Sequence, residues 1–450
     1  MMLNSQTTNP ILEGRLYKGL LQLALPAMVS MVSIMLFEFV DLMWIGRLGA
    51  EAVAALGAAS WVVWAVKSIA SCVTAGLNAL VARNVGARNS DRMNMWASEG
   101  MVLTVLFSLL IAGSVFAISL FLFQLLGLEP NVAEMAKLYT MYICFGLPFI
   151  FAISSMDSIF RACGNTFIPM IAIVISLSLN ALLDPLFIFG WLGFPKLGMP
   201  GGAVASAIAH VIGTMILMLR LPAVHIRLRW DITNFWLHSL EILRIGTPIG
   251  LLGAVFSIIY IILSKNIAYF GTIPMAAISI AHRIEGIPFF VAFGFSMAVS
   301  AYVGQNLGAG NVRRAERASY LSLGFVSAFL AVTSIIFILF GKELLGFFID
   351  NQAVIDEGYR YLFAVSCLEI FLASEIVLEG AFTGAGDTKP PFLISIPLTF
   401  LRIPFAWYFS IHLGYGVSAI WWVISVSTFL KGILFFLWFL RGKWKTVVIG

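Results

Sequence analysis

Twelve long apolar runs constrain this chain of 450 residues more than any other feature. A transmembrane helix needs about 20 consecutive, mostly apolar residues. The runs predict spans at roughly 18–45, 52–80, 95–123, 133–159, 167–190, 201–220, 240–264, 274–303, 317–340, 354–378, 391–412 and 416–440. Twelve such spans leave only short loops between them, so the sequence predicts an all-α integral membrane protein with twelve transmembrane helices.

Composition excludes several other classes of protein. Hydrophobic residues make up 60% of the chain and charged residues only 11%, whereas an ordinary soluble domain carries about 25% charged residues. The lack of alternating ten-residue segments argues against a membrane β-barrel. The four cysteines form no Cys-x-x-Cys pair, so neither a disulfide framework nor a zinc site is predicted. A lipid bilayer is the expected surrounding.

The distribution of Lys and Arg among the loops predicts the orientation. With an even number of spans both termini face the same side, and the loops on that side hold 16 Lys and Arg residues against six on the other. By the positive-inside rule, both termini lie in the cytoplasm. We therefore expect a multi-pass protein of the cytoplasmic (inner) membrane. The net charge of +5 arises in these loops and calls for no nucleic-acid partner.

A shift of 222 residues aligns the chain with itself. It matches Pro26 with Pro248, NVGARNSDR (84–92) with NLGAGNVRR (306–314), and FRACGNTFIP (160–169) with FTGAGDTKPP (382–391). Each repeat holds six spans, an even number, so both copies have the same orientation. We expect two six-helix lobes, residues 1–222 and 223–450, related by a pseudo-twofold axis along the membrane normal. This geometry is typical of an alternating-access carrier, with a channel or scaffold as the alternative.

Five stretches carry a resemblance to a known family. They are FVDLMWIGRLGAEAVAALG (39–57), VARNVGARN (81–89), FRACGNT (160–166), VGQNLGAGN (303–311) and GAFTGAGDT (380–388). With them the chain resembles the multidrug and toxic compound extrusion (MATE) transporters over essentially its whole length. The resemblance implies a secondary active antiporter that exports diverse, often cationic or amphipathic drugs and uses an inward H⁺ or Na⁺ gradient. Such export confers drug resistance.

The sequence offers no other source of energy. No Walker motif, Gly-rich phosphate loop or nucleophile constellation is present, so we expect neither an enzyme nor a cofactor. A monomer is expected. The alternative function is a lipid-linked oligosaccharide flippase from a related branch of the superfamily, although such flippases usually have extra spans and a strongly cationic cleft.

Ionisable residues inside spans are the best guide to a site, because each is costly in the bilayer unless it is paired or hydrated. Asp41 in the first span and Asp184 in the fifth reach similar depths in the outer part of the bilayer. Asn180 lies one helical turn before Asp184. Ser206 and Tyr139 reach the same depth when residues are counted from the ends of their spans at about 1.5 Å each. We therefore predict a coupling site in the first lobe.

The predicted coupling site suits two cations. Oxygen ligands from Asp41, Asn180 and Asp184 are those that Na⁺ prefers, and two clustered carboxylates with Tyr139 also suit proton exchange. Some Na⁺-dependent relatives have an acidic residue in span 7, and residues 248–264 contain none. This difference favours H⁺, with competitive Na⁺ binding at the same site.

For each predicted site residue, the alternative to a coupling role is a purely structural one. Asp184 precedes Pro185, and its carboxylate would then satisfy backbone groups that the proline frees. Asp41 would reach the outer interface beside Arg47. For Ser206 and Tyr139 the alternatives are packing or ordinary hydrogen bonding.

The repeat suggests that the site is one-sided and that other residues gate transport. The register places Asp41 on Leu263, Asn180 on Arg402 and Asp184 on Ala406, so the second lobe lacks the carboxylate pair. Pro26 is a candidate hinge in the first span, with a static kink as the alternative. Candidate gating charges near the cytoplasmic ends are Asp157, Arg283 and Glu379. His210 and His282 are expected to be core residues.

Overall fold

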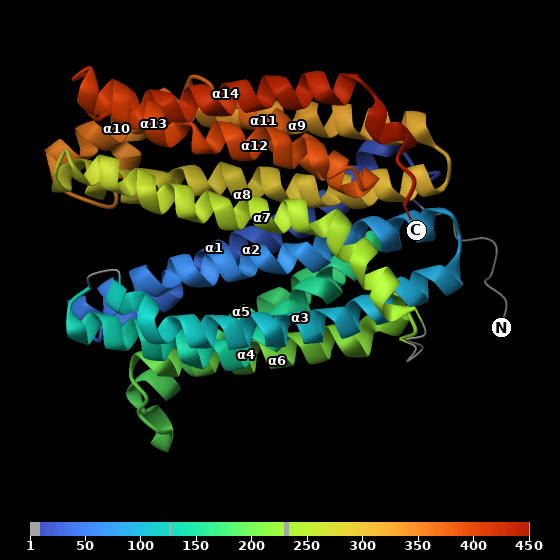
Figure 1. The fold of residues 1–450 in the computed structure, drawn as a ribbon, viewed down its shortest axis with the longest axis horizontal. Coiled ribbons are helices and arrows are strands. Elements are labelled where there is room, and N and C mark those ends of the chain that lie inside the picture. Colours follow the sequence, from blue (N-terminus) through green and yellow to red (C-terminus); the bar gives the residue numbers. More distant parts are fainter. Residues whose placement is uncertain (1–9, 126–127, 229–233, 450) are drawn as a thin grey trace. The chain divides into compact units, whose positions relative to one another are not determined.

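The computed structural model describes residues 10–125, 128–228 and 234–449, and every regular element within them is a helix. The α-helices are α1 (Leu16–Gly46), α2 (Ala50–Gly86), α3 (Ser90–Leu125), α4 (Pro130–Ala162), α5 (Phe167–Phe189), α6 (Met199–Arg220), α7 (Phe235–Ala268), α8 (Thr272–Gly308), α9 (Val312–Gly346), α10 (Gln352–Ser366), α11 (Ile370–Ala385), α12 (Lys389–Phe400), α13 (Arg402–Trp407) and α14 (Ser418–Leu440) (Figure 1). Short helical turns are η1 (Trp191–Gly193), η2 (Leu221–Val224), η3 (Tyr408–His412) and η4 (Lys443–Thr446).

The prediction of twelve transmembrane spans is confirmed. In the described part of the chain eleven helical segments are long and apolar enough to cross a membrane, with α12, α13 and η3 together forming one of them, and the number is twelve when the bent pair α10 and α11 is counted as one span. The two helices of this pair meet at 60°, where the sequence analysis expected one helix at 354–378. The break at residues 366–369 contains neither proline nor glycine, so the apolar run does not reveal it.

The internal repeat reappears in the backbone. Gly164 follows α4 and Gly386 follows α11, with φ of 86° and 79°. In both copies the residue after the glycine donates its N–H to the carbonyl five residues earlier, at 2.9 Å. Glycine adopts this left-handed conformation without a steric penalty, and the bond is the 6→1 bond of a Schellman motif. Two helix ends 222 residues apart are therefore built alike.

Contacts divide the chain into two compact units whose borders fall inside helices. The N-terminal unit is Val29–Ala254, and the C-terminal unit joins the residues up to Met28 to Val255–Ile449. One border cuts α1 and the other cuts α7. These borders do not coincide with the ends of the sequence repeat, and the lobes 1–222 and 223–450 stay a prediction.

Close helix contacts hold the N-terminal unit together. Helices α2, α3 and α4 pack on one another, and α6 packs on both α4 and α5 (Figure 1). The first half of α7 lies directly against α2, because a Cβ at Gly246 would stand 2.0 Å from the Cys72 carbonyl oxygen and one at Gly250 would stand 2.3 Å from Cys72 Sγ. Small residues of this kind let membrane helices approach closely.

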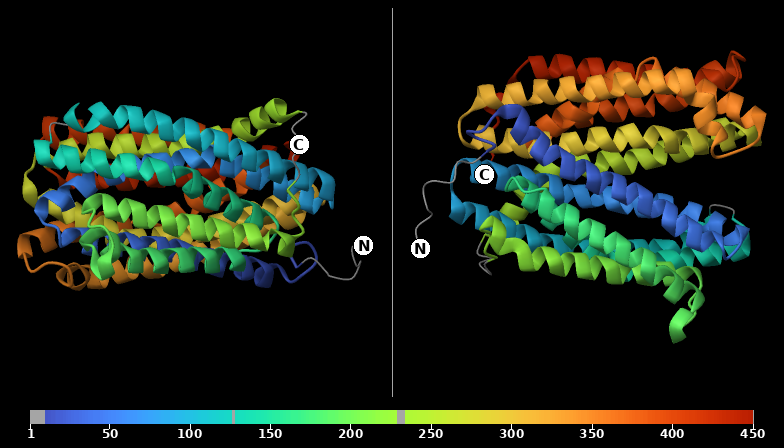
Figure 2. Two further views of the ribbon diagram at one scale, coloured as in Figure 1. Left: turned by 90° about the horizontal axis from the view of Figure 1, so that it is seen from below. Right: turned by 180° about the vertical axis from the view of Figure 1, so that it is seen from behind.

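The C-terminal unit is built around α8, which packs on α9, α10 and α11 (Figure 2). The first half of α1 belongs to the same core, since Leu20 and Leu23 are buried in one cluster with Tyr302. Arg314 forms a hydrogen bond with the segment before α1. Its Nε donates to the Ile11 carbonyl oxygen at 2.8 Å, and its Nη2 donates to the Tyr302 hydroxyl oxygen at 2.8 Å.

Candidate functional site

Two helices of the N-terminal unit bring two carboxyl groups together. Asp41 lies on α1, and α5 carries both Asn180 and Asp184, which are fully buried. Asn180 Nδ2 donates to Asp184 Oδ1 at 2.8 Å. The carboxyl groups of Asp41 and Asp184 interact with each other electrostatically.

Helix α6 packs closely beside this pair of acids. A Cβ at Gly201 would stand 2.4 Å from the Phe187 carbonyl oxygen, so α6 lies directly on the backbone of α5. A Cβ at Gly202 would stand 3.9 Å from Asp184 Oδ1 and 3.5 Å from Ile45 Cδ1. Ser206 is buried one helical turn after Gly202 and shares its face of α6.

Tyr139 and a lysine complete the electrostatic surroundings. Tyr139 on α4 is only 5% exposed, and its phenol interacts electrostatically with Asp41 and Asp184. Lys67 on α2 is exposed, and its charge interacts with both Asp41 and His210. Lys67 had no predicted role, because a single lysine in an apolar run does not show which helix it faces.

Three oxygen atoms of this cluster have no hydrogen-bond partner. They are Asp41 Oδ1, Asn180 Oδ1 and Asp184 Oδ2, and each is buried. A buried acceptor without a donor costs about 1–3 kcal/mol, so three in one place fit a bound cation. Among the described residues no group of three His, Cys, Asp or Glu side chains has metal-binding geometry. The donor set is therefore two carboxyl groups and an amide oxygen, which suits H⁺ or Na⁺.

The recorded contacts bear on the structural alternatives for the two acids. The Arg47 guanidinium lies over the Trp44 ring, 4.5 Å from its centroid, and thus has an aromatic partner. The recorded partner of Asp184 Oδ1 is the Asn180 amide, while Asp184 Oδ2 is unpartnered. Neither carboxylate oxygen of Asp184 satisfies a backbone group freed by Pro185.

The candidate hinge and gating residues have contacts of their own. Helix α1 runs without interruption through Pro26, which precedes the border of the two units by two residues. Asp157 forms an ion pair with Arg161 within α4, at 3.2 Å. Glu379 on α11 interacts with the charge of Lys431. Arg283 on α8 is exposed. The gating and hinge roles stay predictions.

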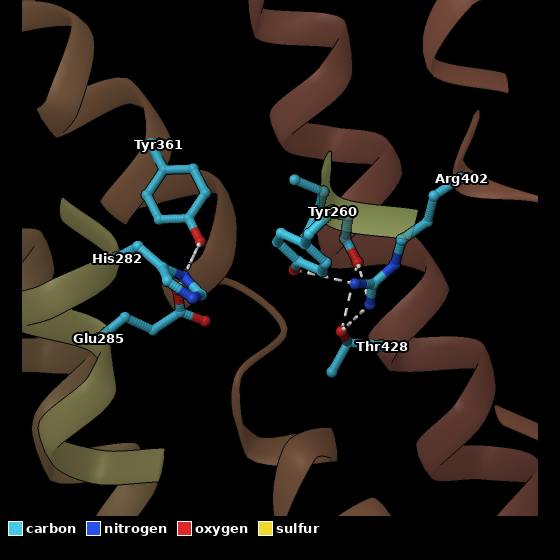
Figure 3. Close-up of polar contacts among 7 residues, drawn as sticks. Tyr260, His282, Glu285, Tyr361, Arg402 and Thr428 are labelled. Atoms are coloured by element: carbon cyan, nitrogen blue, oxygen red, sulfur yellow. Dashed lines mark hydrogen bonds and ion pairs between the residues drawn. The ribbon is translucent and has the colours of Figure 1, made fainter. Parts of the chain in front are cut away.

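The C-terminal unit holds a second polar cluster, which the sequence analysis missed (Figure 3). Tyr361 donates its hydroxyl to Glu285 Oε2, and His282 Nδ1 lies 3.3 Å from the same oxygen. The His282 side chain is 46% exposed, so the expectation that it is a core residue is wrong. The spacing of His282 and Glu285, three residues apart on one helix face, is the signal that would have revealed the pair.

Comparisons with known proteins agree with the repeat and with the helical architecture. The family model MatE matches residues 26–186 and again residues 248–408, so the two matches begin 222 residues apart. The probable multidrug resistance protein NorM of Thermotoga maritima is 28% identical over 435 residues, which are 95% of this chain and 93% of that protein.

A second relative and a solved structure extend these comparisons. The FAD transporter of Shewanella oneidensis is 26% identical over 432 residues, which are 94% of each protein. A solved structure of a MOP superfamily transporter from Pyrococcus furiosus has 22% sequence identity and a TM-score of 0.90. The alignment covers 98% of this chain and 100% of that one.

Proposed function

Because the chain belongs to the MatE family of multidrug and toxic compound efflux transporters, we propose that it exports amphipathic or cationic compounds by alternating access. Export is coupled to inward movement of H⁺ or Na⁺ at the Asp41–Asp184 site. The protein spans the membrane many times. Its placement in the cytoplasmic membrane, its cytoplasmic termini and its monomeric state are parts of the same proposal.

One observation carries the assignment of the coupling site. Three buried oxygens of Asp41, Asn180 and Asp184 lack hydrogen-bond partners, and the charges of the two carboxyl groups act on each other. When both carboxyl groups are ionised, their negative charges repel each other, and the repulsion of two like charges is several-fold stronger at an effective dielectric of about 20 than in water. A proton held between them, or a cation bound to their oxygens, removes this repulsion. The site therefore favours occupation by one positive charge.

The coupling follows from this exchange of charge. With a cation bound, Asp41 and Asp184 attract each other through it, so α1 and α5 are held together. Loss of the cation to the cytoplasm leaves like charges on the two helices and favours their separation. Two arrangements of one site, selected by a cation, are what an antiporter needs.

We favour H⁺ as the coupling ion. Residues 248–264 of α7, where some Na⁺-dependent relatives carry an acid, contain none. The oxygens of the first site still offer ligands for Na⁺, so Na⁺ competes with H⁺ there.

The proposal includes a broad class of substrates. The Thermotoga maritima relative bears the name of a multidrug resistance protein, and the Shewanella oneidensis relative is a transporter of FAD. We propose amphipathic and cationic drugs for this chain, because its candidate coupling site is anionic. No observation favours the lipid-linked oligosaccharide flippase, and we do not propose it.

Transport by purified protein in liposomes tests the function and the ion together. We expect efflux of a cationic dye under an imposed pH gradient in Na⁺-free buffer, with inhibition by added Na⁺. Asp41→Asn protein, reconstituted at the same density, is the control and should give no gradient-driven efflux. Efflux driven only by a Na⁺ gradient at constant pH would replace H⁺ by Na⁺, and no efflux under either gradient would refute export.

A further inference from the structure

The repeat places an arginine where the first lobe has an amide of its coupling site. Arg402 matches Asn180, while Leu263 matches Asp41 and Ala406 matches Asp184. The C-terminal unit thus has no carboxylate pair at these positions and has a guanidinium instead. Arg402 begins α13 and is only 3% exposed, so its positive charge is fixed inside the unit.

Four neutral oxygens accept hydrogen bonds from this guanidinium, and Figure 3 shows those of Tyr260 and Thr428. Arg402 Nε donates to Ser427 Oγ at 2.5 Å, and Nη1 donates to the Tyr260 hydroxyl oxygen at 3.0 Å. Its Nη2 donates to Thr428 Oγ1 at 3.1 Å and to the Ile424 carbonyl oxygen at 3.5 Å. Helices α7 and α14 supply all four acceptors, which we call the oxygen cage.

Contacts outside the guanidinium hold the cage in place. The hydroxyl groups of Ser427 and Thr428 both donate to the Ile424 carbonyl oxygen, at 2.8 and 3.2 Å. The Tyr260 ring packs on His282, with centroids 5.8 Å apart. These acceptors are therefore positioned by α14 and α8 and do not depend on Arg402 alone.

No acid neutralises Arg402 directly. Among the described residues no carboxylate forms an ion pair with it, because the nearby acids have other partners. Glu375 is paired with Lys431 at 2.5 Å, and Glu285 accepts from Tyr361. A buried charge without a direct counterion is costly unless polar groups solvate it. The oxygen cage supplies this solvation.

We infer that Tyr260, Ser427, Thr428 and the Ile424 carbonyl form a cation-binding site whose permanent occupant is the chain's own Arg402. The class of ligand is a guanidinium ion, since the acceptors match the N–H donors spread around this planar group. A further consequence rests on the proposed function: the C-terminal unit keeps a fixed cation while the N-terminal unit exchanges a mobile one.

Chemical rescue tests the cage without any need for transport. Arg402→Ala should lower the melting temperature of the purified protein and leave the cage vacant. Guanidinium chloride at low millimolar concentration should then raise this melting temperature by several degrees, in a saturable manner. Tetramethylammonium, which has no N–H donor, should have no effect. Arg402→Gln, whose side chain still fills the space, and the natural protein are matched controls that should show no stabilisation.

A charge series keeps the test informative if Arg402→Ala does not fold. Arg402→Lys preserves the charge and Arg402→Gln preserves only hydrogen bonding, so the Lys variant should melt closer to the natural protein. Equal melting temperatures for the two, or an equal effect of guanidinium on every variant, would overturn the proposal. These experiments measure melting temperatures and not transport. A failure of dye efflux would therefore not affect the test of the oxygen cage, and a failure of guanidinium rescue would not affect the test of the coupling site.

Discussion

At the scale of single residues, the helical period predicts some contacts of the candidate site and misses others. Asn180 and Asp184 lie four residues apart, and their predicted shared face is confirmed by a 2.8 Å hydrogen bond. Counting along the spans places Asp41 at the same depth, but depth does not determine which side chains touch. The contact between Asp41 and Asp184 depends on how α1, α5 and α6 pack around Gly202, which one sequence does not reveal.

Substitutions of the two acids should have non-additive effects. We expect Asp41→Asn and Asp184→Asn each to reduce gradient-driven efflux more than about tenfold, and the double variant to lose little more, because either change alone removes the shared charge. Initial efflux rates in proteoliposomes of matched protein density provide the measurement. Glu51→Gln is the control, since Glu51 is an exposed carboxylate in the first turn of α2. Independent, multiplicative losses would contradict a shared site.

At the scale of elements, α1 and α7 differ from the other helices because each contributes to both units. Their prolines, Pro26 and Pro248, occupy matching repeat positions close to the borders after Met28 and Ala254. The proline is evident in the sequence. The border is not, since it depends on which neighbours each half of the helix packs against.

Removal of the first of these prolines should separate transport from binding. Pro26→Ala restores a backbone donor and stiffens α1 at the border, so we expect efflux to fall several-fold more than dye affinity. Initial efflux rates and fluorescence titration of the detergent-solubilised protein measure the two quantities. Pro248→Ala, the matching change in a helix without a coupling acid, should have the smaller effect on ion coupling. Equal losses of efflux and affinity would argue for a static kink.

At the scale of the whole molecule, hydropathy and self-alignment predict the twelve spans and the repeat. The order of apolar residues marks the spans, and matching motifs rich in Gly, Pro and polar residues mark the repeat, so no three-dimensional information is needed. The two compact units, in contrast, are not evident from the sequence. Their borders arise because Leu20 and Leu23 join the core around Tyr302, and because Gly246 and Gly250 fit closely against Cys72. Such contacts between distant segments have no local signature.

Expression of fragments divided at the repeat border should test whether half of α7 belongs to the N-terminal unit. Fragment 1–222 lacks the half of α7 that completes its unit, so we expect it to be degraded when expressed alone and stabilised when fragment 223–450 is co-expressed. Fragment 29–254, which keeps that unit whole, is the control and should accumulate to a higher level. Membrane immunoblots with a shared epitope tag measure the levels. Equal accumulation of fragments 1–222 and 29–254 would contradict the assignment of half-helices to units.

The packing of α1 against α8 also determines when the contacts of α1 can form during translation. Leu20 leaves the ribosome about 280 residues before Tyr302, its neighbour in the finished core. At about 5–20 residues per second, the interval is about 14–56 s. During this interval the opening half of α1 has none of its native neighbours from α8, and only lipid or the insertion machinery can cover it. The opening half of α1 is thus translated well before the helix that it packs against.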